Sequence, residues 1–106
     1  MAVTPGILAD GQLPSSAGDL YTAAGDVYVT TIIVANASAA SRTVNLYIRD
    51  ASSGADRLIT PKDLAMAVGD TMYLTGVKVS LNSGDKIRGS ADSATSVDYV
   101  IWGGTQ

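Results

Sequence analysis

The 106-residue sequence predicts an all-β protein, an antiparallel two-sheet sandwich of about eight strands with a jelly-roll-like arrangement. Runs rich in β-branched and aromatic residues recur about every ten residues, separated by turns of Gly, Asn, Asp and Ser. All ten acidic residues are Asp and none is Glu. Because Asp is typical of turns and strand ends whereas Glu favours helices, this bias supports the β assignment. A chain of this length fits one domain.

Residues 1–18 are predicted to form an N-terminal arm, and residues 19–106 the single β-sandwich domain. Pro and Gly interrupt the first segment too often for a helix or a long strand, at Pro5, Gly6, Gly11, Pro14 and Gly18. Three apolar residues in the segment nevertheless need cover: Ile7, Leu8 and Leu13. Two placements are open, a short edge strand on the chain's own domain or an extended arm on a neighbouring subunit.

Residues 26–36 and 42–50 are predicted to be the two long strands of a central hairpin, joined by the polar residues 37–41. The second strand alternates strictly, with three apolar residues on one face, Val44, Leu46 and Ile48. The first strand is apolar on both faces. One face carries Val27, Val29, Thr31, Ile33 and Ala35, and the other carries Tyr28, Thr30, Ile32 and Val34.

An antiparallel strand with one face in water should alternate more clearly than residues 26–36 do. The face of Tyr28, Ile32 and Val34 is therefore expected to be covered by the arm, by a long loop or by another chain. We select these three residues as a candidate surface for subunit contact, because exposed aromatic and β-branched patches usually mark contact surfaces.

Further strands are predicted at residues 19–23, 57–60, 71–75, 77–81, 86–89 and 96–102. Pro61 removes a ladder donor, so the strand before it is an edge strand or ends there. Residues 62–68 are expected to be extended or to form a single turn.

Alternation predicts which residues of the last strands point inward. In residues 77–81 the inward residues are Val77, Val79 and Leu81, and the outward ones are Lys78 and Ser80. In the final strand one face carries Val97, Tyr99 and Ile101, and the other carries Asp98, Val100 and Trp102. Val100 and Trp102 make a second candidate interaction patch.

The pair Gly-Asp occurs four times, each time just before a predicted strand, at residues 18–19, 25–26, 69–70 and 84–85. Gly allows the positive φ of a tight turn, and the Asp carboxylate accepts backbone N–H bonds nearby. Calcium is the alternative, but a calcium loop gathers several oxygen donors and each of these Asp residues stands alone. The pairs are predicted to be turns.

The composition excludes most site chemistry. The chain has no Cys and no His, which removes disulfides, thiolate chemistry, Cys/His zinc sites and histidine acid–base catalysis. We therefore expect no enzyme activity, no catalytic residues, no cofactor and no metal. The net charge of −3 comes without a basic stripe, so no nucleic-acid partner is expected. No apolar run approaches the roughly 18–20 residues of a membrane span, and the N-terminus lacks the basic start of a secretory signal, so no membrane partner is expected.

Several segments, taken in order, resemble a group of small bacteriophage virion proteins. These segments are Leu20-Tyr21-Thr22-Ala23 with Gly25, Ile32-Ile33-Val34-Ala35-Asn36, Val44-Asn45-Leu46-Tyr47-Ile48, Arg57-Leu58-Ile59 with Pro61, Val68-Gly69-Asp70, and Ser83-Gly84-Asp85-Lys86-Ile87-Arg88-Gly89. The resemblance covers roughly residues 19–103 and consists of turn and strand signatures. Two features depart from it, the bulky Val27-Tyr28-Val29 and the short tail after Trp102.

The resemblance implies a β-sandwich that serves as a capsid decoration (cement) protein on the outer surface of the head, made in the bacterial cytoplasm. It implies two partners, the major capsid protein and further copies of the chain, in the form of a trimer. The N-terminal arm, through Ile7, Leu8 and Leu13, is then the expected contact with the capsid. Without a long fibre-forming extension, decoration is favoured over a fibre role.

Two other roles remain open. The chain could be a tail, baseplate or fibre component that binds a receptor or a carbohydrate, for which Trp102 and scattered Tyr residues would supply the aromatic contacts. It could also be a cellular domain that belongs to no virion.

Overall fold

The computed structural model describes residues 4–105, and within them all side chains except those of residues 75–79. This part of the chain contains no helix and nine strands: β1 (Thr4–Gln12), β2 (Gly18–Thr22), β3 (Val27–Asn36), β4 (Arg42–Arg49), β5 (Asp56–Leu58), β6 (Leu64–Met66), β7 (Thr71–Leu81), β8 (Lys86–Ala91) and β9 (Val97–Thr105).

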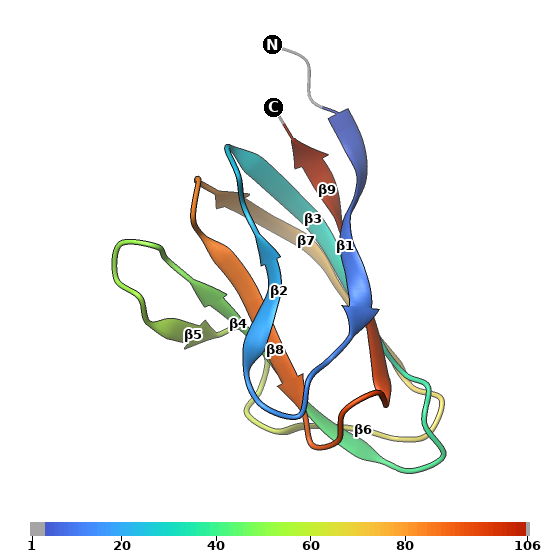
Figure 1. Cartoon of the computed structure of the whole chain (residues 1–106). Coiled ribbons are helices and arrows are strands. Elements are labelled where there is room, and N and C mark those ends of the chain that lie inside the picture. Colours follow the sequence, from blue (N-terminus) through green and yellow to red (C-terminus); the bar gives the residue numbers. More distant parts are fainter. Residues whose placement is uncertain (1–3, 106) are drawn as a thin grey trace.

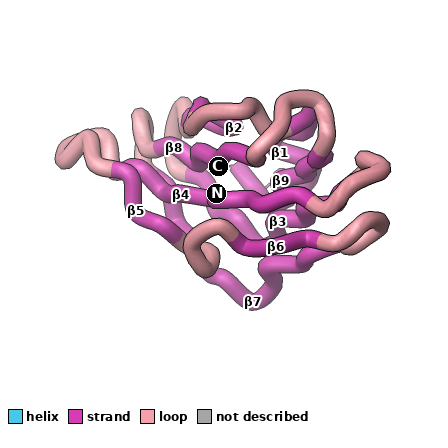
Figure 2. Tube along the Cα trace, turned by 90° about the horizontal axis from the view of Figure 1, so that it is seen from below, coloured by secondary structure: helices cyan, strands magenta, loops and turns pink. Residues whose placement is uncertain are grey.

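The strands form two antiparallel sheets that pack against each other (Figures 1 and 2). Sheet A has the order β1-β9-β3-β7, and sheet B has the order β2-β8-β4-β5, with β6 also paired to β4. The first four strands alternate between the sheets, and the chain later returns to insert β8 and β9 beside them. This is the strand order of a jelly roll, so the predicted fold class is confirmed.

The prediction of a central hairpin is wrong. β3 pairs with β7 and β9 in sheet A, whereas β4 pairs with β5, β6 and β8 in sheet B. Residues 37–41 therefore cross from one sheet to the other. Each strand has an apolar face, and the connection between the two strands is short. This sequence pattern is compatible with a crossing between sheets as well as with a hairpin.

Asn36 fixes the crossing at the end of β3. Its side chain is 3 % exposed. The Nδ2 group donates to the backbone carbonyls of Ala40 at 2.9 Å, Met66 at 3.0 Å and Ala67 at 3.2 Å. The Oδ1 atom accepts from the N–H and the hydroxyl of Ser38, at 3.0 and 2.7 Å. The Asn36 side chain thus forms hydrogen bonds with the backbone of the 37–41 connection and with the backbone at the end of β6.

The core lies between the sheets and follows the predicted alternation in β4 and β9. Val44 and Leu46 of β4 are fully buried, and Ile48 packs against the core at its edge. The fully buried apolar residues with the largest side chains are Leu13, Val29, Val34, Val44, Leu46, Leu81, Ile87, Val97 and Ile101. Tyr99, the third inward residue of β9, is 8 % exposed.

Of the two open placements for the N-terminal segment, the structure shows the edge strand, over the described residues 4–12. β1 pairs with β9 along its length and forms one edge of sheet A. The backbone N–H of Leu13 donates to the carbonyl of Val97 at 2.8 Å, and its side chain is fully buried. Leu13 is therefore a core residue. Loss of this segment would therefore remove core packing together with any contact that the segment makes with a capsid.

A β-bulge in β3 exchanges the two faces that the sequence suggests. Val29 and Thr31 pair with the adjacent residues Gly103 and Trp102 of β9, which leaves Thr30 without an opposite residue. Before the bulge Val27 and Val29 point inward; after it the inward positions pass to Ile32 and Val34, which are 3 % and 0 % exposed. Strict alternation therefore places Ile32 and Val34 on the wrong face, because the extra residue shifts the period by one.

Smaller differences concern strand lengths. Residues 71–75 and 77–81 belong to one strand, β7, in which three residues lie opposite Thr30 alone. The predicted directions of Val77, Lys78 and Val79 fall outside the described side chains. Residues 62–68, expected to be extended or a single turn, contain the short strand β6, and β9 continues past Trp102 to Thr105.

Two of the four Gly-Asp pairs close the same type of turn. In residues 67–70 and 82–85, the Asp N–H donates to the carbonyl three residues earlier, and the Asp carboxylate accepts that residue's N–H at 2.9 Å. The glycines have φ values of 80° and 91°, as the third position of a type II turn requires. The turn interpretation is confirmed for these two pairs.

Candidate interaction surface on sheet A

The structure brings four of the eight candidate interface residues together on the outer face of sheet A. Tyr28, Trp102 and Ile7 are 43 %, 44 % and 57 % exposed, and Val100 is half-buried. The other four do not join them. Leu8 is partly buried against the core, and Leu13, Ile32 and Val34 are core residues.

The register of sheet A defines the rows of this surface. Ile7 on β1 lies opposite Trp102 on β9, which lies opposite Thr31 on β3. In the next row Val100 stands between Asp10 and Ile33. Side chains that are neighbours in one row stand about 5 Å apart, within contact distance. The outer face is therefore continuous from the edge strand β1 to β3.

Two residues of this surface were not selected from the sequence. Tyr73 on β7 lies opposite Ile33 and is 62 % exposed. Tyr73 stands between Met72 and Leu74, which are partly buried against the core, so the alternation of a strand places its side chain on the outer face. Strict alternation places Ile33 on the face opposite to that of Tyr28, and no sequence signal marks the bulge that turns it outward. We call the set Ile7, Tyr28, Ile33, Tyr73, Val100 and Trp102 the sheet A face.

The charged side chains described on this face are acidic. Asp10 and Asp98 are exposed; Asp10 on β1 lies opposite Val100, and Asp98 lies two residues before Val100 on β9. The Gln12 amide donates to the Asp98 carboxylate at 3.2 Å. Beneath the face, burial raises the pKa of the Tyr99 phenol, and the negative charge of Asp10 raises it further. The face therefore combines apolar side chains with negative charge.

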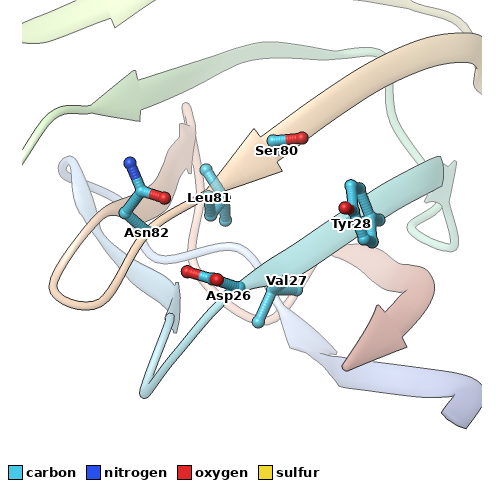
Figure 3. Close-up of a pocket in the computed structure, with 6 residues that line it drawn as sticks. All are labelled: Asp26, Val27, Tyr28, Ser80, Leu81 and Asn82. Atoms are coloured by element: carbon cyan, nitrogen blue, oxygen red, sulfur yellow. The ribbon is translucent and has the colours of Figure 1, made fainter. Parts of the chain in front are cut away.

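A hollow of about 190 Å³ lies where β3 begins and β7 ends (Figure 3). Val27 and Leu81 pair across the two strands and are buried. The other four lining residues are exposed: Asp26, Tyr28, Ser80 and Asn82. A carboxylate, an amide, a hydroxyl and an aromatic ring thus surround the hollow. Its volume is below the roughly 300–1,000 Å³ of pockets for drug-sized ligands.

The outer face of sheet B differs, because ion pairs cover it. Asp19 on β2 contacts Lys86 and Arg88 of β8, each at 2.8 Å. Arg88 also contacts Asp56 on β5, which pairs with Arg49 at 2.8 Å. The hydrogen bonds from Lys86 and then Arg88 lower the pKa of Asp19, and the bond to Asp19 raises the pKa of Arg88. These charges are matched within the chain, so this face has less need of a charged partner.

Among the described residues, no cluster of three His, Cys, Asp or Glu could hold a metal ion. The described side chains also contain no buried polar atom without a hydrogen-bond partner. The described part of the chain has no helix long and apolar enough to cross a membrane. The sheet A face, with its adjoining hollow, is therefore the surface on which we base the functional argument.

Comparisons of the chain with protein-family models, with curated proteins and with solved structures gave no match.

Proposed function

We propose that the protein is a non-enzymatic structural protein of a bacteriophage particle, a decoration (cement) protein that binds the outer surface of the head. The observation that carries the proposal is the sheet A face. Six large apolar side chains are exposed in the described chain, and four of them lie on this one face. Patches of this kind usually mark contact surfaces, so the chain is suited to assembly.

The virion assignment is supported by the resemblance of residues 19–103 to small phage virion proteins. The jelly-roll strand order is compatible with it, because the fold is frequent in viral capsid domains. The fold alone does not imply the function, since the same architecture serves many roles. The sheet A face adds the contact surface that a cement protein needs.

The mechanism would be mechanical. A cement protein sits where capsomers meet and adds buried area across joints that the internal pressure of the packaged DNA pulls apart. Burial contributes roughly 25 cal/mol per Å² of apolar surface, so a few hundred Å² contribute a few kcal/mol per copy. Of the three residues expected to contact the capsid, Ile7 has a largely exposed side chain, and β1 thus offers an apolar contact to the shell.

The test is the copy number of the protein in particles purified from its phage, measured by quantitative mass spectrometry against the major shell protein. A copy number near that of the shell protein is expected for a decoration protein. A handful of copies would instead indicate a tail or fibre component, and absence from the particles would overturn the virion proposal.

A matched pair of variants tests the surface. Trp102→Asp places a charge on the sheet A face, and Val68→Asp places one on a side chain that is 57 % exposed in the turn after β6. Only the first should reduce incorporation into particles. Equal incorporation of both variants would exclude the sheet A face as the assembly surface.

One observation favours the second candidate, a tail, baseplate or fibre module that binds carbohydrate. Tyr28 borders the same hollow as the carboxylate of Asp26 and the amide of Asn82, and this combination suits a sugar ring. A glycan array with the wild type and Asp26→Ala tests it. Binding that the variant loses would support this role, and no binding to any glycan would remove it.

A further inference from the structure

Three of the four sheet edges carry features that oppose the pairing of a further strand. In the part of the chain that the structure describes, sheet A ends at β1 and β7, and sheet B ends at β2 and at β5 with β6. β1 contains Pro5 and a register shift between Ile7 and Ala9. β2 has five residues and a register shift between Asp19 and Tyr21, and β5 and β6 have three residues each. Short strands, bulges and Pro are means by which proteins keep an edge from pairing with other chains.

The fourth edge, β7, has none of these features over its first five residues. Residues 71–75, with the sequence Thr-Met-Tyr-Leu-Thr, contain no Pro and no charged residue. They pair with residues 31–35 of β3 in an uninterrupted register, and no other described strand pairs with them. The register becomes irregular only after Thr75, where three residues lie opposite Thr30. Figure 2 shows β7 at the margin of the molecule. A regular stretch of strand is therefore open along this edge.

The register shows which backbone groups of this stretch point outward. Just before β7 begins, the N–H of Asn36 donates to the carbonyl of Asp70 at 2.9 Å. Because hydrogen-bonded pairs alternate along an antiparallel ladder, the even-numbered residues of the stretch exchange bonds with β3. The N–H and C=O groups of Thr71 and Tyr73 consequently point away from β3. Both residues are exposed, and no described residue of another segment bonds to these groups.

The side chains of the same stretch leave apolar surface uncovered at the edge of the core. Val34 of β3 is fully buried, whereas Met72 opposite it is only partly buried. Ile32 is 3 % exposed, and its partner Leu74 is again only partly buried. On the outer face of the sheet, Tyr73 is 62 % exposed. A further strand beside β7 would thus cover apolar surface on both sides of sheet A, which favours its binding.

We propose that β7 binds an extended segment of a different polypeptide, which adds a fifth strand to sheet A beside residues 71–75. Outward N–H and C=O groups two residues apart are complementary to another extended backbone. The segment would exchange hydrogen bonds with Thr71 and Tyr73. Its alternate side chains would lie beside Met72 and Leu74 and would be apolar, and its central residues would not include Pro. This inference goes beyond the proposed function and does not depend on the virion assignment.

Two observations favour a free segment over the β7 edge of a second copy. The open stretch is short, because the turn at residues 67–70 bounds it on one side and the irregular register after Thr75 bounds it on the other. The inward side chains of a second copy's β7 also pack already against that copy's own core. They would not be available to cover Met72 and Leu74, whereas the side chains of a free segment would be.

Amide hydrogen exchange of the full chain, followed by NMR, tests the proposal at single residues. In the free protein the amides of Thr71 and Tyr73 should exchange faster than those of Met72 and Leu74, because they face solvent. The probes are peptides of about nine residues, selected on the wild-type protein from a random library displayed on yeast. The selected peptides should alternate apolar residues. Their addition should slow the exchange of Thr71 and Tyr73 at least about tenfold.

A matched pair of variants separates the backbone of the edge from its side chain. Tyr73→Pro removes an outward N–H that β3 does not use, so the variant should fold and bind the peptides at least about tenfold more weakly than the wild type. Tyr73→Ala removes the same ring but keeps the N–H, and it should bind more tightly than Tyr73→Pro. Equal binding by the two variants would overturn the proposal. So would a Tyr73→Pro protein that does not fold where Tyr73→Ala does, since the N–H would then bond to β3.

Two further results would also overturn the proposal. One is a selection in which no peptide protects the amides of Thr71 and Tyr73. The other is protection that appears without peptide and rises with protein concentration, since that would identify a second copy as the occupant. Absence of the protein from phage particles would overturn the proposed function and leave the result of the peptide experiment unchanged.

Discussion

The ring of Tyr99 on β9 packs against the backbone of Gly11 on the edge strand β1, directly opposite it in the antiparallel register. A Cβ on Gly11 would lie 3.3 Å from the Tyr99 hydroxyl and 3.4 Å from its ring, and Gly11 has a φ of 153°. The same hydroxyl donates to the carbonyl of Leu20 in sheet B at 3.4 Å. An aromatic side chain that covers a glycine on an edge strand is a known means of fixing register. Here it also connects the edge of sheet A to sheet B.

The contact predicts that Gly11→Ala destabilises the protein by about 1–3 kcal/mol, because the residue must keep a strained φ and crowd the ring. Denaturant unfolding followed by circular dichroism measures the loss. The matched control is Gly6→Ala on the same strand, where a Cβ would meet nothing within 4 Å. Equal stability of the two variants would contradict the importance of the Tyr99 contact.

Gly103→Ala should prevent folding. A Cβ at this position would lie 1.9 Å from the backbone oxygen of Tyr28, because β9 approaches β3 closely beside the bulge at Thr30. The backbones of β9 and β3 cannot move apart to make room for this Cβ without loss of the pairing between the two strands. Gly6 is the β-ladder partner of Gly103, so Gly6→Ala is again the control. The measurements are the soluble yield and the circular dichroism spectrum. A folded, soluble Gly103→Ala protein would contradict the close approach of β9 to β3 beside the bulge.

Asn36→Ala should cost at least about 2 kcal/mol, because the backbone carbonyls of Ala40, Met66 and Ala67 lose their donor in a buried or partly buried place. Asn36→Asp should be no better, since a carboxylate cannot donate to those carbonyls. Ser38→Ala, which removes only the hydroxyl contacts of the same loop, is the control and should cost less. Unfolding free energies from urea titration rank the three variants, and an Asn36→Asp protein as stable as the wild type would exclude the assigned role.

A pair of alanine variants separates the core from the sheet A face. Ile32→Ala removes a buried side chain and should cost about 2–5 kcal/mol. Trp102→Ala truncates an exposed side chain and should change the stability of the monomer by less than about 1 kcal/mol. The measurement is unfolding at low protein concentration, where association does not contribute. A larger loss of stability for Trp102→Ala than for Ile32→Ala would mean that β3 alternates strictly and has no bulge.

Acid should weaken the turn at residues 82–85. Backbone N–H bonds from Ala51 and then Asn82 lower the pKa of Asp85 from its ordinary value of 3.8. A carboxyl with a lowered folded pKa contributes stability that is present above the unfolded pKa and is lost as the pH falls through the folded pKa. The stability difference between wild type and Asp85→Ala should therefore be largest near neutral pH and shrink below pH 3.8.

Thermal unfolding between pH 7 and about pH 2 measures that difference. Ser83→Ala in the same turn removes no carboxylate, so its effect should not vary with pH. A difference for Asp85→Ala that stays constant with pH would contradict the cause assigned to the pKa shift.

Most of the strands could be predicted from the sequence, because their signals are local. The alternation in residues 42–49 and 97–101 is strict, and Gly, Pro and Asp mark the turns between strands. The absence of Cys and His likewise limits the site chemistry without any structure. Val100, Trp102 and Tyr28 could be selected in the same way, since large apolar residues on a predicted outward face need only the period of a strand.

Tertiary structure decided which faces and which strands meet. Residues 26–36 and 42–50 read equally well as a hairpin or as a crossing between sheets, and the long-range hydrogen bonds of Asn36 select the crossing. The bulge at Thr30 arises because β9 and β7 pair with β3 in a register that no local signal encodes. One extra residue then buries Ile32 and Val34 and exposes Ile33. The sequence by itself determined the fold class and the composition of the surfaces, whereas the pairing of distant strands decided which side chains form the sheet A face, because register is a property of two strands at once.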